Sequence, residues 1–158
     1  MEPLTTAALE WAVASRGLES GVSGDAHIAR PLPGGALFGV VDGLGHGPAA
    51  AAAAREAVRY LSAVEVEDPI SVVRGCHERV RETRGVVLTL AWIDGTRDCM
   101  TWLGVGNVQG ELLRAHADPR PRRETLDGRG GIVGRLLPPL HAGVLPIAPG
   151  DLLVLASD

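Results

Sequence analysis

The sequence has 158 residues, enough for one domain with a sizeable core, and 46% of them are apolar against 22% charged. Fifteen basic residues, all arginine, stand against nineteen acidic ones, and the net charge of −4 argues against nucleic acid or an anionic membrane as the main partner. The start of the chain lacks the pattern of a signal peptide, and no apolar segment approaches the roughly 20 residues that span a bilayer. Cys76 and Cys99 form no CxxC pair, as is typical of reduced thiols, so we expect a cytoplasmic protein.

The first half of the chain predicts strands followed by two helices. Residues 9–16, LEWAVASR, alternate well enough for a strand, and a short strand with a turn is expected within residues 24–35. The nearly continuous apolar run ALFGVVD, residues 36–42, predicts a central strand. A helix is predicted over residues 48–61, with proline in its first turn, where the missing N–H does no harm. An Asp-Pro pair begins a second helix over residues 68–83.

After Gly85 the pattern changes to that of strands. GVVLTLAWID and CMTWLGVGN predict two strands joined by an Asp94-Gly95 turn, and VQGELLRAH would continue the meander. Residues 116–131 predict a loop, and DLLVLASD, residues 151–158, predicts a last apolar strand. Sequential hairpins with two helices adjacent in sequence favour an antiparallel α+β fold over alternating βαβ units.

The segment DGLGHG, residues 42–47, joins the predicted central strand to the first helix and allows three interpretations. Free N–H groups at a helix start bind phosphate, but the glycine spacing fits neither the dinucleotide nor the P-loop pattern, and an acid there would repel a pyrophosphate. Aspartate and glycine are also ordinary turn residues. The third interpretation is a metal site, because a carboxylate beside an unobstructed glycine carbonyl suits Mg²⁺ or Mn²⁺.

One carboxylate is too few for such a cation, so further acids at strand ends would support the metal site. Asp25 follows Gly24 just before a predicted strand, and Asp158 closes the last one. A sandwich of two sheets could bring Asp25, Asp42 and Asp158 together, although many aspartates at strand ends only terminate strands.

Five motifs recur here in the order of a known family: VSGDA, VVDGLGHG, WLGVGN, GIVGRLLP and PGDLLVLASD. Together they span residues 21–158 and resemble the metal-dependent serine/threonine phosphatases of the PPM, or type 2C, superfamily. The likeness is greatest to the bacterial RsbX-like branch, with SpoIIE and RsbU more distant. It implies a four-layer α/β/β/α sandwich of two antiparallel sheets flanked by helices, formed by residues 1–158 as a single domain.

The resemblance also implies a binuclear Mn²⁺ or Mg²⁺ centre. By motif match Asp25 would bind one metal, Asp42 would bridge both, Gly43 would give its backbone carbonyl, and Asp158 would bind the first. A hydroxide would then attack the phosphorus of phosphoserine or phosphothreonine in line. His46, the one imidazole inside a motif, is either a proton donor to the leaving alkoxide or only a turn histidine.

Two departures from the family pattern stand out. The family continues beyond Asp158 with a glycine, a helix and a later metal-binding aspartate, so the resemblance implies a domain truncated at its carboxyl end. The wider superfamily has an arginine near its start that contacts substrate phosphate, and no matching motif is present. The arginine-rich segment 114–135 is either a docking loop for an acidic partner or phosphopeptide, or a solvated loop.

The function implied by the resemblance is a cytoplasmic, metal-dependent protein phosphatase. Its substrate would be a phosphorylated STAS-domain regulatory protein of a bacterial partner-switching or stressosome pathway, with no nucleic acid and no membrane as partner. The alternative is a non-catalytic, phosphatase-like module that binds partner proteins.

Overall fold

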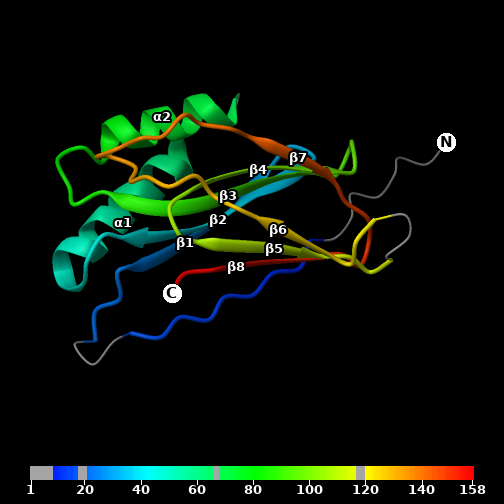
Figure 1. Ribbon diagram of the computed structural model, residues 1–158, viewed down its shortest axis with the longest axis horizontal. Helices are drawn as coiled ribbons and strands as arrows, with labels where there is room; N and C mark the ends of the chain where they lie inside the picture. Colours follow the sequence, from blue (N-terminus) through cyan, green and yellow to red (C-terminus); the bar gives the residue numbers. More distant parts are fainter. Residues whose placement is uncertain (1–8, 18–20, 66–67, 117–119) are drawn as a thin grey trace.

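In the computed structural model, which describes residues 9–17, 21–65, 68–116 and 120–158, two helices cover one face of a five-stranded sheet and a three-stranded sheet covers the other (Figure 1). The helices are α1 (Gly47–Ala63) and α2 (Pro69–Arg79). The first sheet has the spatial order β1 (Asp25–Leu32), β2 (Gly35–Gly43), β3 (Val86–Asp94), β4 (Cys99–Val105), β7 (Gly143–Pro146). The second has the order β6 (Arg123–Leu126), β5 (Gln109–Leu113), β8 (Leu152–Ala156). All these pairs are antiparallel, which confirms the predicted α+β sandwich.

Helix α1 is built from small residues on the face that meets the sheet. Its buried positions include Ala50, Ala53, Ala57 and Leu61, at helical spacing, and Pro48 lies in the first turn as predicted. A Cβ placed on Gly43 of β2 would lie 1.9 Å from the carbonyl oxygen of Ala50, so only glycine allows the helix to approach this strand so closely. Helix α2 begins at the predicted cap, where the Asp68 carboxylate accepts a hydrogen bond from the Ser71 N–H at 3.0 Å. Neither described helix is long and apolar enough to cross a membrane.

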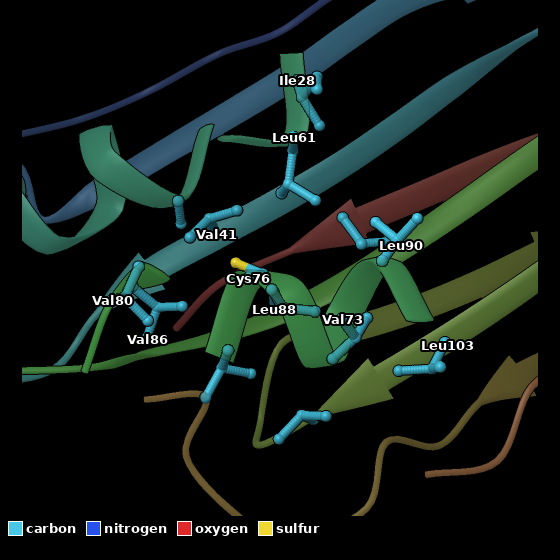
Figure 2. Packing of buried hydrophobic residues seen from close by; sticks show 14 of the residues in the cluster. Ile28, Val41, Leu61, Val73, Cys76, Val80, Val86, Leu88, Leu90 and Leu103 are labelled. Carbon is cyan, nitrogen blue, oxygen red and sulfur yellow. The ribbon is translucent and has the colours of Figure 1, made fainter. Parts of the chain in front are cut away.

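Strand β3 is the centre of the sandwich, because both of its faces are buried. Val86, Leu88 and Leu90 point toward the two helices. They belong to one buried cluster with Val41 of β2 and Val73 of α2 (Figure 2). The alternate residues of β3 face the second sheet, and the hydroxyl of the fully buried Thr89 donates to the Val108 carbonyl at 2.8 Å. Burial on both faces explains why this strand reads as an unbroken apolar run rather than as an alternating one.

Three local predictions were wrong. Residues 9–16 form no strand, although they alternate, and Trp11 and Val13 are 57% and 52% exposed. The helix predicted to reach residue 83 ends at Arg79, and the residues after it form turns. The predicted loop 116–131 contains the short strand β6, whose partner is β5.

The path of β5 is the main difference from the predicted meander. Instead of pairing with β4, this strand crosses to the second sheet, where it pairs with β6 and β8. The glycine before it, Gly106, has φ of 92° and lies over Val87, so the turn that redirects the chain requires glycine. The crossing places the turn after β4 next to the end of β8.

A buried arginine joins the two sheets where β5 ends. The side chain of Arg114 is 3% exposed and forms ion pairs with Glu124 of β6 and with Asp151, the latter at 3.2 Å. Its guanidinium also donates to the carbonyl of Pro146, the last residue of β7 in the other sheet. The two acids and the carbonyl together satisfy the charge that the fold buries at this point.

Replacing Arg114 by methionine is expected to lower the free energy of unfolding by about 3–5 kcal/mol, because two acids would be left without their buried partner. The control is Arg123→Met, whose side chain is 66% exposed and pairs with Glu111 on the surface, and which should cost less than about 1 kcal/mol. Urea unfolding followed by circular dichroism measures both. Equal, small losses in the two variants would contradict a structural role for Arg114.

Candidate functional site

Two of the predicted metal ligands are brought together by the β1–β2 hairpin. Asp25, the first residue of β1, is the direct register partner of Asp42 near the end of β2. Side chains directly opposite one another in antiparallel strands have Cβ atoms about 4.5–5.5 Å apart, so these carboxylates are neighbours. The hydroxyl of Ser23 donates to the Asp25 carboxylate at 3.3 Å and accepts from the Asp25 N–H at 3.1 Å, which fixes the start of the strand.

Gly24 keeps the space beside these carboxylates open. A Cβ at Gly24 would lie 3.2 Å from the Cβ of Ala50, 3.4 Å from the carbonyl oxygen of Gly43 and 3.7 Å from Oδ1 of Asp42. Gly43 in turn donates its N–H to the Gly24 carbonyl at 3.0 Å, which continues the hairpin by one more bond. Oδ1 of Asp42 and the carbonyl oxygen of Gly43 therefore border the same small space, and a side chain larger than that of glycine at position 24 would partly fill it.

The third predicted acid reaches the site from the second sheet. Asp158 follows β8, and its Oδ2 accepts a hydrogen bond from Nδ2 of Asn107 at 3.1 Å. Asn107 lies in the turn after β4, which is the turn that the crossing of β5 brings to the end of β8. This asparagine is the last residue of the WLGVGN motif, and its role was not predicted from the sequence. The motif was the one feature of the sequence that pointed to Asn107, because a side-chain amide just after a strand can hold a nearby carboxylate by a hydrogen bond.

The electrostatics of the site show that the other two acids act on Asp42. The pKa of Asp42 is raised from 3.8 to about 6, first by burial and then by the negative charges of Asp25 and Asp158. Carboxylate and carbonyl oxygens of this kind fit Mg²⁺ or Mn²⁺ in their chemistry, because these cations prefer oxygen donors and relieve such repulsion. Among the described residues, however, no three His, Cys, Asp or Glu side chains converge closely enough to complete a metal site. The acids therefore lie near one another, but they do not by themselves form a complete coordination site in this structure.

His46 is placed differently from the acids. It is the residue before α1, with φ of −147° and ψ of 170°, and its side chain is exposed and makes no capping hydrogen bond. The flanking residues Gly45 and Gly47 both have positive φ, so the loop depends on glycine on either side of it. Of the five residues predicted for the site, the structure places Asp25, Asp42 and Gly43 together in one hairpin and Asp158 close enough for its charge to act on Asp42, and it leaves the His46 side chain exposed.

No protein-family model matches the sequence, and no curated protein sequence matches it. Solved structures do. One is a chain of the bacterial stressosome, described as a modular system adapted to control secondary messenger signalling, with 29% identity, a TM-score of 0.82, and coverage of 89% of this chain and 71% of that one. RsbX in complex with magnesium has 19% identity and a TM-score of 0.77, over 87% of this chain and 67% of that one. The PP2C domain of SiaA from Pseudomonas aeruginosa has 22% identity and a TM-score of 0.70, over 84% and 55%. The chain therefore has a PPM-type phosphatase-like fold.

Replacing Asp42 by asparagine is expected to stabilise the metal-free protein at neutral pH. The pKa of Asp42 is about 6 in the folded state against 3.8 for an ordinary aspartate, so the folded state binds this proton more tightly. The stability that protonated Asp42 contributes to the folded state is present below about pH 4 and is lost as the pH rises through about 6. Asparagine does not ionise, so the variant should be more stable than the wild type by about 1 kcal/mol near pH 7.5 and nearly equal to it near pH 4, after allowance for solvent screening.

Urea unfolding in EDTA at the two pH values measures this difference. The matched control is Asp98→Asn, an exposed aspartate in the β3–β4 turn with φ of 49°, a backbone conformation that asparagine also adopts. The control should show no pH-dependent gain. A loss of stability in Asp42→Asn near pH 7.5 would contradict the view that burial and the neighbouring acids destabilise ionised Asp42.

Proposed function

We propose that the chain is a metal-dependent phosphatase that removes phosphate from serine or threonine in a regulatory protein. The observation that carries this proposal is the register of the β1–β2 hairpin, which sets Asp25 opposite Asp42 beside a space that Gly24 keeps open. The position of Asp158, held by Asn107, and the PPM-type fold support it.

Under this proposal the carboxylates of Asp25, Asp42 and Asp158 and the carbonyl of Gly43 would hold a binuclear Mn²⁺ or Mg²⁺ centre, and Asp42 would be the ligand shared by both cations. When bound, such cations supply a nucleophilic water at neutral pH and neutralise the charge of the phosphoryl oxygens. Asn107 positions Asp158 through its hydrogen bond to Oδ2, which leaves the other carboxylate oxygen for a ligand.

The leaving oxygen of serine or threonine needs a proton as the phosphorus–oxygen bond breaks. We assign His46 as the candidate donor, because its exposed imidazole lies on the loop that follows Asp42 and is not used to cap α1. Gly45 and Gly47, with φ of 86° and 77°, hold the loop in a conformation that presents this side chain to solvent.

The substrate we propose is a phosphorylated STAS-type regulatory protein in bacterial stress signalling, and the compartment is the cytoplasm. The support is the similarity to a chain of the bacterial stressosome and to RsbX, both over more than four-fifths of this chain. A second candidate function is a phosphatase-like module that binds its partner without catalysis. It is favoured by the incomplete convergence of acids among the described residues.

The first test is hydrolysis of p-nitrophenyl phosphate with Mn²⁺. We expect metal-dependent turnover that falls by about 100-fold or more in Asp42→Asn, since this substitution removes the bridging carboxylate. Asp98→Asn, at the opposite end of β3, should keep the wild-type rate. Turnover that persists in Asp42→Asn would exclude the bridging role, whereas turnover absent from the wild type would favour the binding module.

A second test concerns the residue that positions Asp158. Asn107→Ala should raise the Mn²⁺ concentration needed for half-maximal activity by about tenfold, because substitutions at residues that orient a metal ligand typically cost about 10- to 100-fold in affinity. Calorimetric titration with Mn²⁺ gives the same affinity without turnover. Replacing the nearby, exposed Gln109 by alanine is the control and should leave the affinity unchanged. An unchanged affinity in Asn107→Ala would remove the positioning role.

A further inference from the structure

Two exposed arginines, Arg84 and Arg135, lie beside the loop that follows Asp42. The N–H of Leu44 donates to the carbonyl of Gly85 at 2.9 Å, so the segment before β3 is bonded to this loop. A Cβ placed on Gly45 would lie 2.6 Å from Nη1 of Arg84, which means that the guanidinium rests against the backbone of Gly45. Gly45 is only three residues past Asp42. Its contact with Arg84 therefore places a positive charge at the edge of the candidate site.

Arg135 is held next to the same segment. Its Nη2 donates to the carbonyl of Thr83 at 2.7 Å, and its Cγ would lie 3.1 Å from a Cβ at Gly85. The backbone N–H of Arg135 donates to the Ile132 carbonyl at 3.1 Å, in a segment that an isolated bridge from Val133 joins to Val86. Arg135 therefore comes from a part of the chain distant in sequence, yet its guanidinium binds the residue directly before Arg84.

Neither guanidinium is used for an internal ion pair in the part of the chain that the structure describes. The ion pairs found there involve other arginines, namely Arg59, Arg79, Arg81, Arg97, Arg114 and Arg123. Glu82, two residues before Arg84, forms no ion pair with it in the described part of the chain. Two fixed positive charges thus face solvent on a chain whose net charge is −4.

We propose that Arg84 and Arg135 form a rim that binds acidic side chains flanking the phosphorylated serine or threonine of the partner protein. This inference rests on the proposed phosphatase function and names a property of its substrate. Guanidinium groups bind carboxylates through two parallel hydrogen bonds, which gives direction as well as affinity. An acidic phosphoprotein would otherwise be repelled by a negatively charged enzyme, so a local positive rim also orients the encounter.

The rim lies within reach of a short stretch of extended peptide from the site. The Cα of Gly45, against which Arg84 lies, is three residues from that of Asp42 and so at most about 11 Å away. An extended peptide covers that distance in about three residues. The acids recognised by the rim are therefore expected two to four positions from the phosphorylated residue.

The experiment measures peptide binding by fluorescence anisotropy on the Asp42→Asn background, where hydrolysis is blocked. The probes are two labelled phosphoserine peptides, one with aspartates two to four positions from the phosphoserine and one with serines there. The acid-flanked peptide should bind about tenfold more tightly at low salt, and the preference should shrink as salt screens the charges. The double variant Arg84→Gln/Arg135→Gln should lose this preference.

The matched control is Arg97→Gln, whose side chain is 82% exposed and which follows β3 at the end away from the rim. The nine residues of β3 separate the two places by about 30 Å, so this change in net charge should leave the preference intact. Arg84→Lys, which keeps the charge but not the planar fork, should retain part of it. Urea unfolding of each variant verifies that it is folded.

The outcomes separate this inference from the function on which it rests. Equal binding of the two peptides by the parent protein, or a preference that survives in Arg84→Gln/Arg135→Gln, overturns the rim even if p-nitrophenyl phosphate is hydrolysed. A preference lost in that variant and kept in Arg97→Gln establishes the rim even if the wild type has no turnover, in which case the chain binds phosphoproteins without hydrolysing them.

Discussion

The close approach of α1 to β2 at Gly43 determines the geometry of the end of the molecule that carries the candidate site. The carbonyl of Ala50 lies where a Cβ on Gly43 would be, so the helix starts directly above the last residue of the strand. The loop between them must turn within a few residues, and it does so with positive φ at Gly45 and Gly47. As a result Asp42 stays in the sheet, opposite Asp25, while His46 and the surface of Gly45 are displayed at the rim.

This arrangement carries an electrostatic cost that the rest of the fold must offset. Asp42 is partly buried and close to two other acids, and all three effects raise its pKa. The compensation comes from elsewhere: β3 is buried on both faces, and Arg114 fixes the start of β8 through Asp151 while joining the two sheets. Because Asp158 lies two residues past the end of β8, the ion pair just before the strand helps to set the position of the acid just after it.

Much of the fold followed from local patterns, and the exceptions have a common cause. The central strands, both helices and the Asp68 cap each have a signal within a few residues, and the short turn after Leu32 sets the register that opposes Asp25 and Asp42. The crossing of β5 and the strand β6 depend on pairing with distant residues, which no local pattern encodes. Residues 9–16 show the converse, since an alternating pattern without a pairing partner gives no strand.

The same limit applies to the site. The acids had motif signals, and Arg135 lies in the GIVGRLLP motif and at the end of the arginine-rich segment 114–135, but Arg84 had no signal in the sequence. Arg84 meets Gly45 only because β3 runs next to β2, and Arg135 reaches Thr83 across more than fifty residues of chain. The proposed metal centre would also change the net charge of the end of the molecule that carries the three carboxylates and the two arginines. Three carboxylates and two arginines give this end a net charge of about −1, which two divalent cations would change to about +3. Bound cations would thus add a general attraction for an acid-flanked phosphoprotein to the direct contacts that we propose for Arg84 and Arg135.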